Sequence, residues 1–256
     1  LVFMLYEDEE MSVERIIERV AQNGSLVDFV DGQDVHHRLF AITSEEDIGA
    51  IAEMMRDKSC IIADGHHRYE TALTYSKESG KAGAAYQMLA FANTGQKGLV
   101  VLATHRLVGN LENFDFKRLL AGLEDNFQII GYKLDSLPSK LEAMQKMFAQ
   151  IKAQGDSNRS AFGIYGGNSA FYTAVLKDER AMDSVARDMS SAWRRLDISV
   201  LHKLVLEALL GIDEKKLAKG GYVEYVKGTD TAINDSIAEI DAGKKQAVFF
   251  VNPPKL

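Results

Sequence analysis

One short stretch gathers the residues best suited to acid–base or anion chemistry, and it reads Asp64-Gly65-His66-His67-Arg68-Tyr69-Glu70. Apolar residues before it predict a strand over 59–63, and apolar residues at helical spacing after it predict a helix over 66–79. Gly65 allows the chain to leave the strand tightly. The first turn of a helix offers unpaired amides and the positive end of the helix dipole, and both favour an anion. We therefore predict a phosphate-binding turn between this strand and this helix.

The side chains of this stretch divide into two chemical groups. His67 and Arg68 are donors that can clamp an oxyanion, the arginine through its planar fork. Asp64 and Glu70 are carboxylates that can act as a base, and His66 can carry a proton from the helix face that it shares with Glu70 at i+4. The competing interpretation is structural. In it, Asp64 is a plain N-cap and the histidines begin a solvated helix.

Three of the six histidines directly precede an arginine, giving His37-Arg38, His67-Arg68 and His105-Arg106. Each pair falls in or beside a predicted strand, and Thr104 precedes the last pair after a strand expected over 99–103. Convergence of the pairs at one edge of a sheet would build a small positive pocket in an acidic protein. Coincidence is the alternative. The predicted phosphate- or nucleotide-binding residues are Gly65, His67, Arg68, His37, Arg38, Thr104, His105 and Arg106, and the predicted catalytic residues are Asp64, His66 and Glu70.

A protein-ligated transition metal is not predicted. Adjacent histidines on a strand point to opposite faces, so His36-His37 offers at most one ligand, and the His-Glu-x-x-His motif is absent. Mg²⁺ that arrives with a nucleotide needs only one carboxylate, for which Asp64 is the first choice.

Composition limits the classes of function. The chain has 256 residues and a net charge of −7, which disfavours nucleic acid as a partner because such binding depends on neutralising phosphates. Apolar runs are too short for a membrane span, and a single cysteine excludes a disulfide framework. We therefore expect a cytoplasmic protein with a small anionic or phosphorylated ligand. The chain begins and ends on predicted strands, which indicates a piece of something longer.

Amphipathic helices alternate with short apolar or β-branched runs, and this pattern predicts an α/β (α+β) fold. We expect one region over 1–110 and a second α/β region over 111–256. Ser44 followed by Asp47 resembles a capping box, which predicts a helix that starts after Ser44 and runs to about Asp57. Further helices are expected over 13–22, 66–79, 84–91, 115–125, 139–154, 178–190, 199–210 and 230–241. Strands are expected at 26–30, 35–42, 59–63, 99–103, 127–134, 160–165, 170–176, 223–226 and 247–251. The segment Leu196–His202 reads as a capped, buried helix start in which His202 is more often structural than catalytic.

Several segments of the chain resemble a bacterial and archaeal family known as domain of unknown function 1015. They are Ala63–Leu73, His37–Phe40, Gly98-Leu99 with Thr104–Val108, and Leu196–His202. The family pattern usually has Trp where Phe40 stands and Pro where Ala103 stands, and neither change removes a polar group. The family's Pro-Pro-Tyr-Asp, His-Glu-x-Thr and Lys-Ser-Thr segments are absent from this chain.

The stretch Gly65–Arg68 is also similar to the phosphate-binding turn of the ParB and sulfiredoxin superfamily. That superfamily includes CTP switches, ATP-dependent sulfinic acid reductases and free-serine kinases. The resemblance implies a ParB/sulfiredoxin-like core with a strand-turn-helix phosphate site, plus a second α/β half, and contacts from His67 and Arg68 to phosphate. His66 stands where sulfiredoxins carry their reactive cysteine, so sulfiredoxin chemistry is not expected, and the DNA-binding helices of ParB proteins have no counterpart here.

Together, these patterns predict a phosphate- or nucleotide-binding protein. Its leading form is a small-molecule kinase or another phosphotransferase that uses a nucleotide with Mg²⁺. The alternative is a nucleotide-sensing or partner-binding regulator without turnover. The sequence makes no prediction about the oligomeric state.

Overall fold

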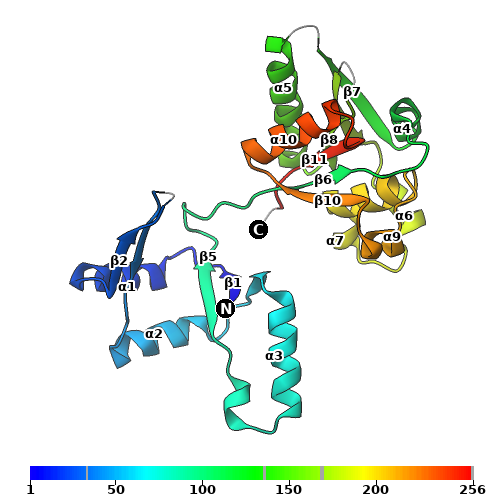
Figure 1. Ribbon diagram of the computed structural model, residues 1–256. Coiled ribbons are helices and arrows are strands. Elements are labelled where there is room, and N and C mark those ends of the chain that lie inside the picture. The colour runs from blue at the N-terminus through cyan, green and yellow to red at the C-terminus, as the bar shows by residue number, and fades with distance from the viewer. Residues whose placement is uncertain (33, 135–136, 168–169, 255–256) are drawn as a thin grey trace. The chain divides into compact units, whose positions relative to one another are not determined.

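The computed structural model describes residues 1–32, 34–134, 137–167 and 170–254, and it divides into two compact units between Val100 and Val101 (Figure 1). Helices and strands occur in both units, so the predicted α/β class is confirmed. The division falls before the expected one at residue 110. The reason is that strand β6 (Thr104–Val108) pairs with β10 (Val223–Lys227) and β11 (Ala247–Val251) of the second unit.

A small sheet of strand order β4-β1-β5 organises the first unit. Strand β1 (Val2–Tyr6) is central, antiparallel to β4 (Ile61–Asp64) and parallel to β5 (Leu89–Asn93). Strands β2 (Val27–Val30) and β3 (His36–Leu39) form a separate antiparallel hairpin. The helices are α1 (Ser12–Val20), η1 (Ala21–Asn23), α2 (Glu45–Met55), α3 (His66–Glu78) and η2 (Ala82–Ala85).

A buried polar cluster ties α1 to the end of the central strand. Tyr6 donates to Glu14 Oε1 at 2.9 Å, and Asn93 donates to Glu14 Oε2 at 3.1 Å. The Asn93 amide also donates to the carbonyl of Asp8 and accepts from its N–H. Burial and the adjacent carboxylate of Glu14 raise the pKa of Tyr6 above its ordinary range. The Tyr6 hydroxyl therefore stays protonated, and the cluster joins β1, β5 and α1 to one another.

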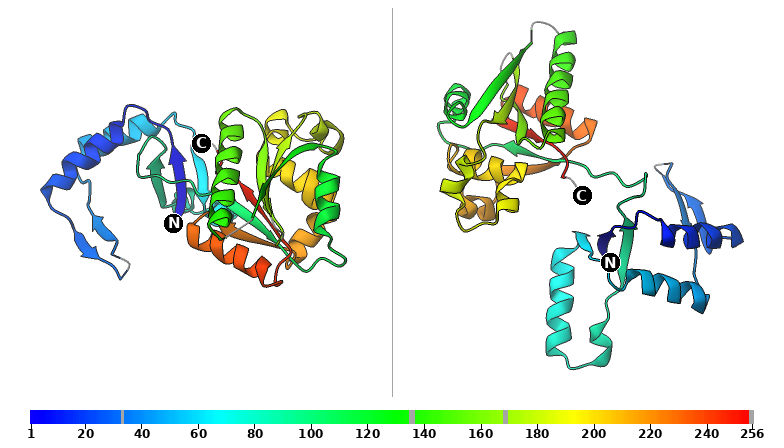
Figure 2. Two further views of the ribbon diagram at one scale, coloured as in Figure 1. Left: turned by 90° about the horizontal axis from the view of Figure 1, so that it is seen from above. Right: turned by 180° about the vertical axis from the view of Figure 1, so that it is seen from behind.

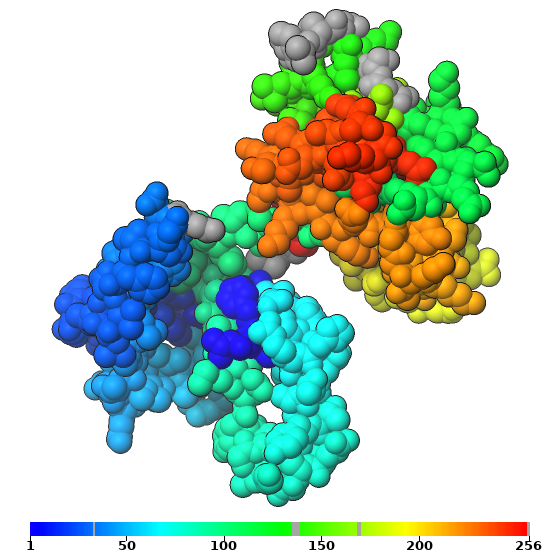
Figure 3. Space-filling view, in the orientation of Figure 1, coloured from blue at the N-terminus to red at the C-terminus, as the bar shows by residue number. Residues whose placement is uncertain are grey.

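The first unit buries few apolar side chains. Among its described residues they are Val2, Met4, Leu5, Tyr6 and Val13, all on β1 or α1. Helix α3 has no buried residue, and the space-filling view shows it exposed along its length in cyan (Figure 3). The elements of the first unit other than β1 and α1 are thus held mainly by backbone pairing and by contacts between exposed or half-buried side chains.

The second unit is a six-stranded sheet of order β10-β6-β11-β8-β9-β7, in which every neighbouring pair is antiparallel. The remaining strands are β7 (Phe127–Lys133), β8 (Ala161–Tyr165) and β9 (Ala170–Leu176). The helices are α4 (Phe116–Leu123), α5 (Leu137–Asp156), α6 (Ala181–Val185), α7 (Ser191–Arg194), α8 (Asp197–Val200), η3 (Leu201–Glu207), α9 (Glu214–Lys219) and α10 (Asp230–Asp241).

Two apolar clusters cover the two faces of this sheet, and helices lie on both sides of it (Figure 2). Successive strand residues alternate between the clusters, as Val248 and Phe249 do on β11. Helices α5 and α10 contribute to one cluster, and α4, α6, α8 and η3 contribute to the other. The two central strands, β8 and β11, are therefore buried along their whole length, and their sequences have no charged or polar side chain apart from the hydroxyl of Tyr165.

Three expected elements were wrong. Residues 84–91 do not form a helix, because Leu89–Asn93 pairs with β1 along its whole length and this pairing overrides local helix propensity. The strand expected over 99–103 begins instead at Thr104. Thr104 is paired with Lys227, the last residue of β10, so the β6–β10 ladder does not extend to earlier residues. The helix expected over 178–190 is reduced to the short helix α6, and a second short helix, α7, begins only after Ser190, which caps it.

Among the described residues, no helix is both long enough and apolar enough to cross a bilayer.

Candidate functional site

The turn from β4 into α3 has the backbone geometry that its sequence predicts. Strand β4 ends at Asp64, Gly65 adopts φ +91°, and the helix begins at His66. None of the described side chains caps this helix, so the amides of its first turn have no side-chain acceptor among those residues. Asp64 is therefore not an N-cap, and the structural interpretation of that residue was wrong. The result is an uncapped helix N-terminus, the arrangement that suits an anion.

Arg68 folds back over this turn. Its guanidinium donates to Asp64 Oδ2 and to the backbone carbonyl of Leu1. A Cβ placed on Gly65 would lie 3.0 Å from the Nε and Nη2 atoms of Arg68. Gly65 is thus required twice, by its positive φ and by the close passage of the guanidinium. The arginine is held in place by the end of β4 and by Leu1, the residue before β1.

The remaining residues of the turn are exposed to solvent. The side chain of His67 is fully exposed, and its Nδ1 lies 3.5 Å from Glu70 Oε2. Glu70 therefore faces His67 at i+3, although the sequence suggested His66 at i+4. The side chain of His66 has no hydrogen bond or ion pair to any described residue. The two predicted bases, Asp64 and Glu70, each have a cationic or potentially cationic neighbour.

The His37-Arg38 pair lies on the β2–β3 hairpin and is occupied by local partners. His37 Nε2 lies 2.8 Å from Asp31 and its ring stacks on Phe29, with centroids 5.0 Å apart. Arg38 lies over the ring of Phe40. The hairpin and α3 lie on opposite sides of β1 and β5 in each view (Figures 1 and 2). These residues therefore do not lie beside the turn.

The Thr104-His105-Arg106 segment lies within strand β6 of the second unit and not after a strand. The side chains that His105 and Arg106 lie against show that these two residues face opposite sides of the sheet. His105 contacts Phe148 and Phe250, which belong to the face of α5. Arg106 is paired in register with Phe249, which belongs to the other cluster. The two side chains therefore cannot reach the same ligand, because strand residues alternate.

His105 is a buried, neutral histidine. Only 2% of its surface is exposed, and burial, with a smaller contribution from Arg106, lowers its pKa to about 4. Nδ1 accepts from the Val251 N–H at 3.2 Å, whereas Nε2 is buried without a hydrogen-bond partner in the part of the chain that the structure describes. Such a group packs the core and does not contact solvent.

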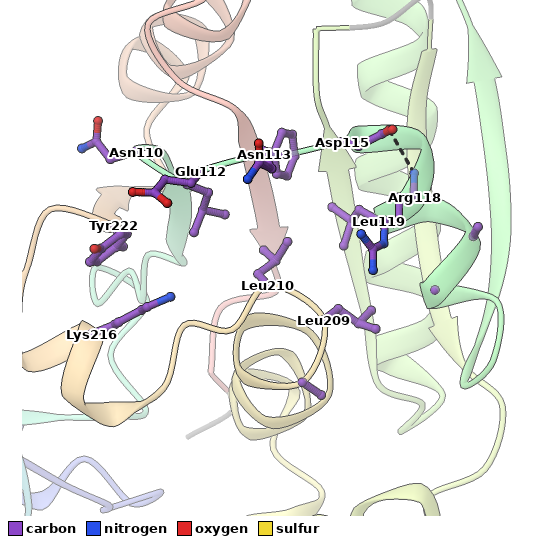
Figure 4. Close-up of a pocket in the computed structure, with 15 residues that line it drawn as sticks. Asn110, Glu112, Asn113, Asp115, Arg118, Leu119, Leu209, Leu210, Lys216 and Tyr222 are labelled. Carbon is purple, nitrogen blue, oxygen red and sulfur yellow. Dashed lines mark hydrogen bonds between the residues drawn. The ribbon is translucent and has the colours of Figure 1, made fainter.

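The second unit also contains a cavity of about 860 Å³ that sequence reasoning missed (Figure 4). Arg118 and Asp115 lie on one side of it, and Lys216 and Tyr222 lie on the other. Neither Arg118 nor Lys216 has an ion-pair partner in the described part of the chain, and Lys216 Nζ lies 5.4 Å from the Tyr222 ring. The asparagine-rich run 110–113, where Asn110 and Asn113 both have positive φ, was its only sequence signal.

No cluster of three or more His, Cys, Asp or Glu side chains that could hold a metal ion occurs among the described residues.

Comparison with known proteins adds one family and one solved structure. Residues 1–199 match the family model described as "Protein of unknown function (DUF1015)". No curated protein matches. The solved structure is titled "Free serine kinase in complex with AMP"; it has a TM-score of 0.38 and 15% identity over 99% of this chain and 74% of that chain. A likeness of this size does not establish a shared fold or activity.

Proposed function

This chain belongs to the DUF1015 family of proteins of unknown function, and we propose that it binds a nucleotide or another phosphorylated small molecule at the turn Asp64–Glu70. The observation that carries the proposal is the uncapped N-terminus of α3. The amides of the first turn, the positive end of the helix dipole and the guanidinium of Arg68 all favour negative charge at one place. His67, whose side chain is fully exposed, adds a second donor.

As a phosphotransferase, the site would use its charged residues in separate roles. Arg68 and His67 neutralise the transferring phosphate, while Asp64 or Glu70 accepts the proton of an acceptor hydroxyl and His66 relays it. Mg²⁺ fits this site only in part, because Asp64 Oδ2 already accepts from Arg68. The ion would therefore arrive with the nucleotide and take at most one oxygen of Asp64.

One observation favours the alternative, a regulator that binds the nucleotide without turnover. Asp64 is paired with Arg68, and Glu70 lies beside His67, so both carboxylates have a partner in the site. A general base must be able to accept a proton when the ligand is bound. The single cysteine in the sequence is consistent with a reducing, cytoplasmic setting for either activity.

The deciding experiment is a nucleotide titration of wild type and Arg68→Ala by calorimetry, with and without Mg²⁺. We expect AMP, ADP or ATP to bind wild type and to bind Arg68→Ala about 10-fold or more weakly, since a charge-assisted contact is lost. Arg56→Ala is the matched control, because Arg56 is an exposed arginine of the same unit that pairs with Glu53. Equal binding by all three proteins, or none, would contradict the proposal. Phosphorus NMR of the mixtures then separates turnover from binding alone.

A further inference from the structure

The second unit contains a buried arginine at the centre of strand β6. Only 8% of Arg106 is exposed. Its Nε–H donates to His202 Nε2 at 3.2 Å, and Nη1 donates to the carbonyl of Thr104. The Cζ atom of the guanidinium lies over the Tyr225 ring, 4.6 Å from its centroid. Every one of these contacts fixes the orientation of the guanidinium, and every one is with an uncharged group.

The positive charge of Arg106 has no carboxylate partner among the described residues. Three carboxylates on neighbouring elements lie beside lysines: Glu207 and Glu214 next to Lys203, and Glu224 next to Lys245. Burial lowers the pKa of the Arg106 guanidinium, as expected when a charge is removed from water without compensation. A buried charge without a partner is costly, so a protein that retains one has a use for it.

One end of the guanidinium remains available. Nη2 makes no hydrogen bond in the described chain, and it is not among the buried polar atoms that lack a partner. It therefore keeps contact with solvent, while the rest of the side chain is enclosed. This is the donor that an incoming oxygen atom would meet first, and its neighbour His202 lies beside it.

His202 occupies an unusual backbone segment. Helix η3 has π-helical winding, with the N–H of Ala208 bonded to the carbonyl of Lys203 and that of Leu210 bonded to Val205. Segments of this kind are rare, and they occur frequently where a side chain serves a ligand. The segment places the His202 ring within hydrogen-bond distance of Arg106 from a different element of the unit.

We propose that Arg106 and His202 form an oxyanion site in the second unit, separate from the turn at Asp64–Glu70, which takes the phosphate group of a small molecule. Arg106 Nη2 supplies the first contact, and the His202 ring supplies the second by turning its donor toward the bound oxygen. The competing interpretation is a structural arginine that only packs on Tyr225. That interpretation leaves the missing counter-charge unexplained.

Nuclear magnetic resonance of the Arg106 side chain tests whether phosphate binds there. The full chain is labelled with ¹⁵N-arginine, and the Nε–H resonance of Arg106 is identified by its loss in Arg106→Lys. Sodium phosphate is then added, with sodium chloride at equal ionic strength as the control, and AMP in a parallel series. We expect a saturable shift of this resonance with phosphate and no such shift with chloride. A tighter response to AMP assigns the site to a phosphate ester.

Two variants complete the design. His202→Gln should weaken the phosphate response by roughly 5- to 10-fold, the size expected for one hydrogen bond to a charged group. Arg68→Ala should leave it unchanged, even where that variant has lost nucleotide binding at the turn. A shift equal in phosphate and chloride, or no shift at all, would overturn the proposal. So would loss of the shift in Arg68→Ala, because there would then be a single shared site. If Arg106→Lys does not fold, the displaced resonance in His202→Gln identifies the same group.

Discussion

The Arg68 guanidinium donates to Asp64 Oδ2 across a single turn of chain, so the predicted anion clamp and the predicted base neutralise each other. Both side chains are more than half exposed. An exposed pair of this kind contributes little to stability, about 0–1 kcal/mol. Its effect should therefore be seen in ligand binding and turnover, and much less in unfolding.

Asp64→Asn tests whether the Asp64 carboxylate acts in ligand binding or as the base in turnover. The variant removes the negative charge beside Arg68, so we expect phosphate or nucleotide affinity to rise about 2- to 5-fold, since a nearby like charge no longer opposes the ligand. If Asp64 is the base, turnover falls at least about 100-fold at the same time. Calorimetry gives the first quantity and product formation the second. A loss of affinity would show instead that Asp64 is needed to hold Arg68 in place.

Gly65→Ala tests the close passage of Arg68 over the turn. An alanine at φ +91° should cost roughly 1–2 kcal/mol of the free energy of unfolding, and its Cβ would displace the guanidinium. Gly24→Ala is the control for the cost of a positive φ alone, because Gly24 has φ +93° and nothing within 4 Å of the added Cβ. Its ψ of 145° lies outside the αL region that Gly65 occupies, so urea unfolding should show a loss at least as large for Gly24→Ala, while only Gly65→Ala weakens nucleotide binding. Equal binding by the two would mean that the position of Arg68 does not matter.

His105 should make the second unit less stable in mild acid. Its pKa is lowered from 6.5 to about 4 in the folded protein, so between these values the unfolded state binds more protons. The free energy of unfolding therefore falls as pH falls through this range, by on the order of 2–3 kcal/mol from this group.

His105→Asn removes that titration while keeping an acceptor for the Val251 N–H. Urea unfolding from pH 7 to pH 4 should show a smaller loss of stability in the variant than in wild type. The remaining dependence includes His202, whose pKa is lowered in the same direction by burial first and then by Arg106 and Lys203. Identical slopes in both proteins would contradict a neutral, buried His105.

Asn93 should be essential to the first unit. Asn93→Ala leaves the buried Asp8 N–H without its acceptor and the Oε2 atom of Glu14 without its donor. We expect a loss of roughly 2–3 kcal/mol in the free energy of unfolding. Gln96→Ala removes a single donor to the same carboxylate and should cost less than about 1 kcal/mol. Hydrogen exchange of the β1 and β5 amides is the direct measurement, and equal protection in both variants would argue against the cluster.

The sequence predicted well what depends on neighbouring residues. The turn at Gly65, the cap of α2 by Ser44 and the helix α10 follow from local residue types, and the structure contains all three. It predicted poorly what depends on distant partners. Strand β5 was expected to be helical because only its pairing with β1, more than 80 residues earlier, makes it a strand.

The same distinction applies to the sites. Three His-Arg pairs looked equivalent in the sequence, yet His105 and Arg106 lie on opposite faces of β6, whereas His67 and Arg68 both lie in the first turn of α3. Local alternation could have separated His105 from Arg106 once the strand was placed correctly. The contact between Arg106 and His202 could not be predicted, because it joins residues 96 positions apart.

The π-helical winding of η3 makes this region sensitive to chain length as well as to residue type. Each such turn holds one residue more than an α-helical turn, so loss of a single residue from Leu201–Glu207 would allow ordinary α winding. The backbone would become more regular, while the residues inside the segment, His202 among them, would shift relative to the flanking turns. Such a deletion should therefore move the His202 ring away from Arg106 even though His202 itself is kept, and a length difference in this segment would mark chains that lack the contact before any substitution does.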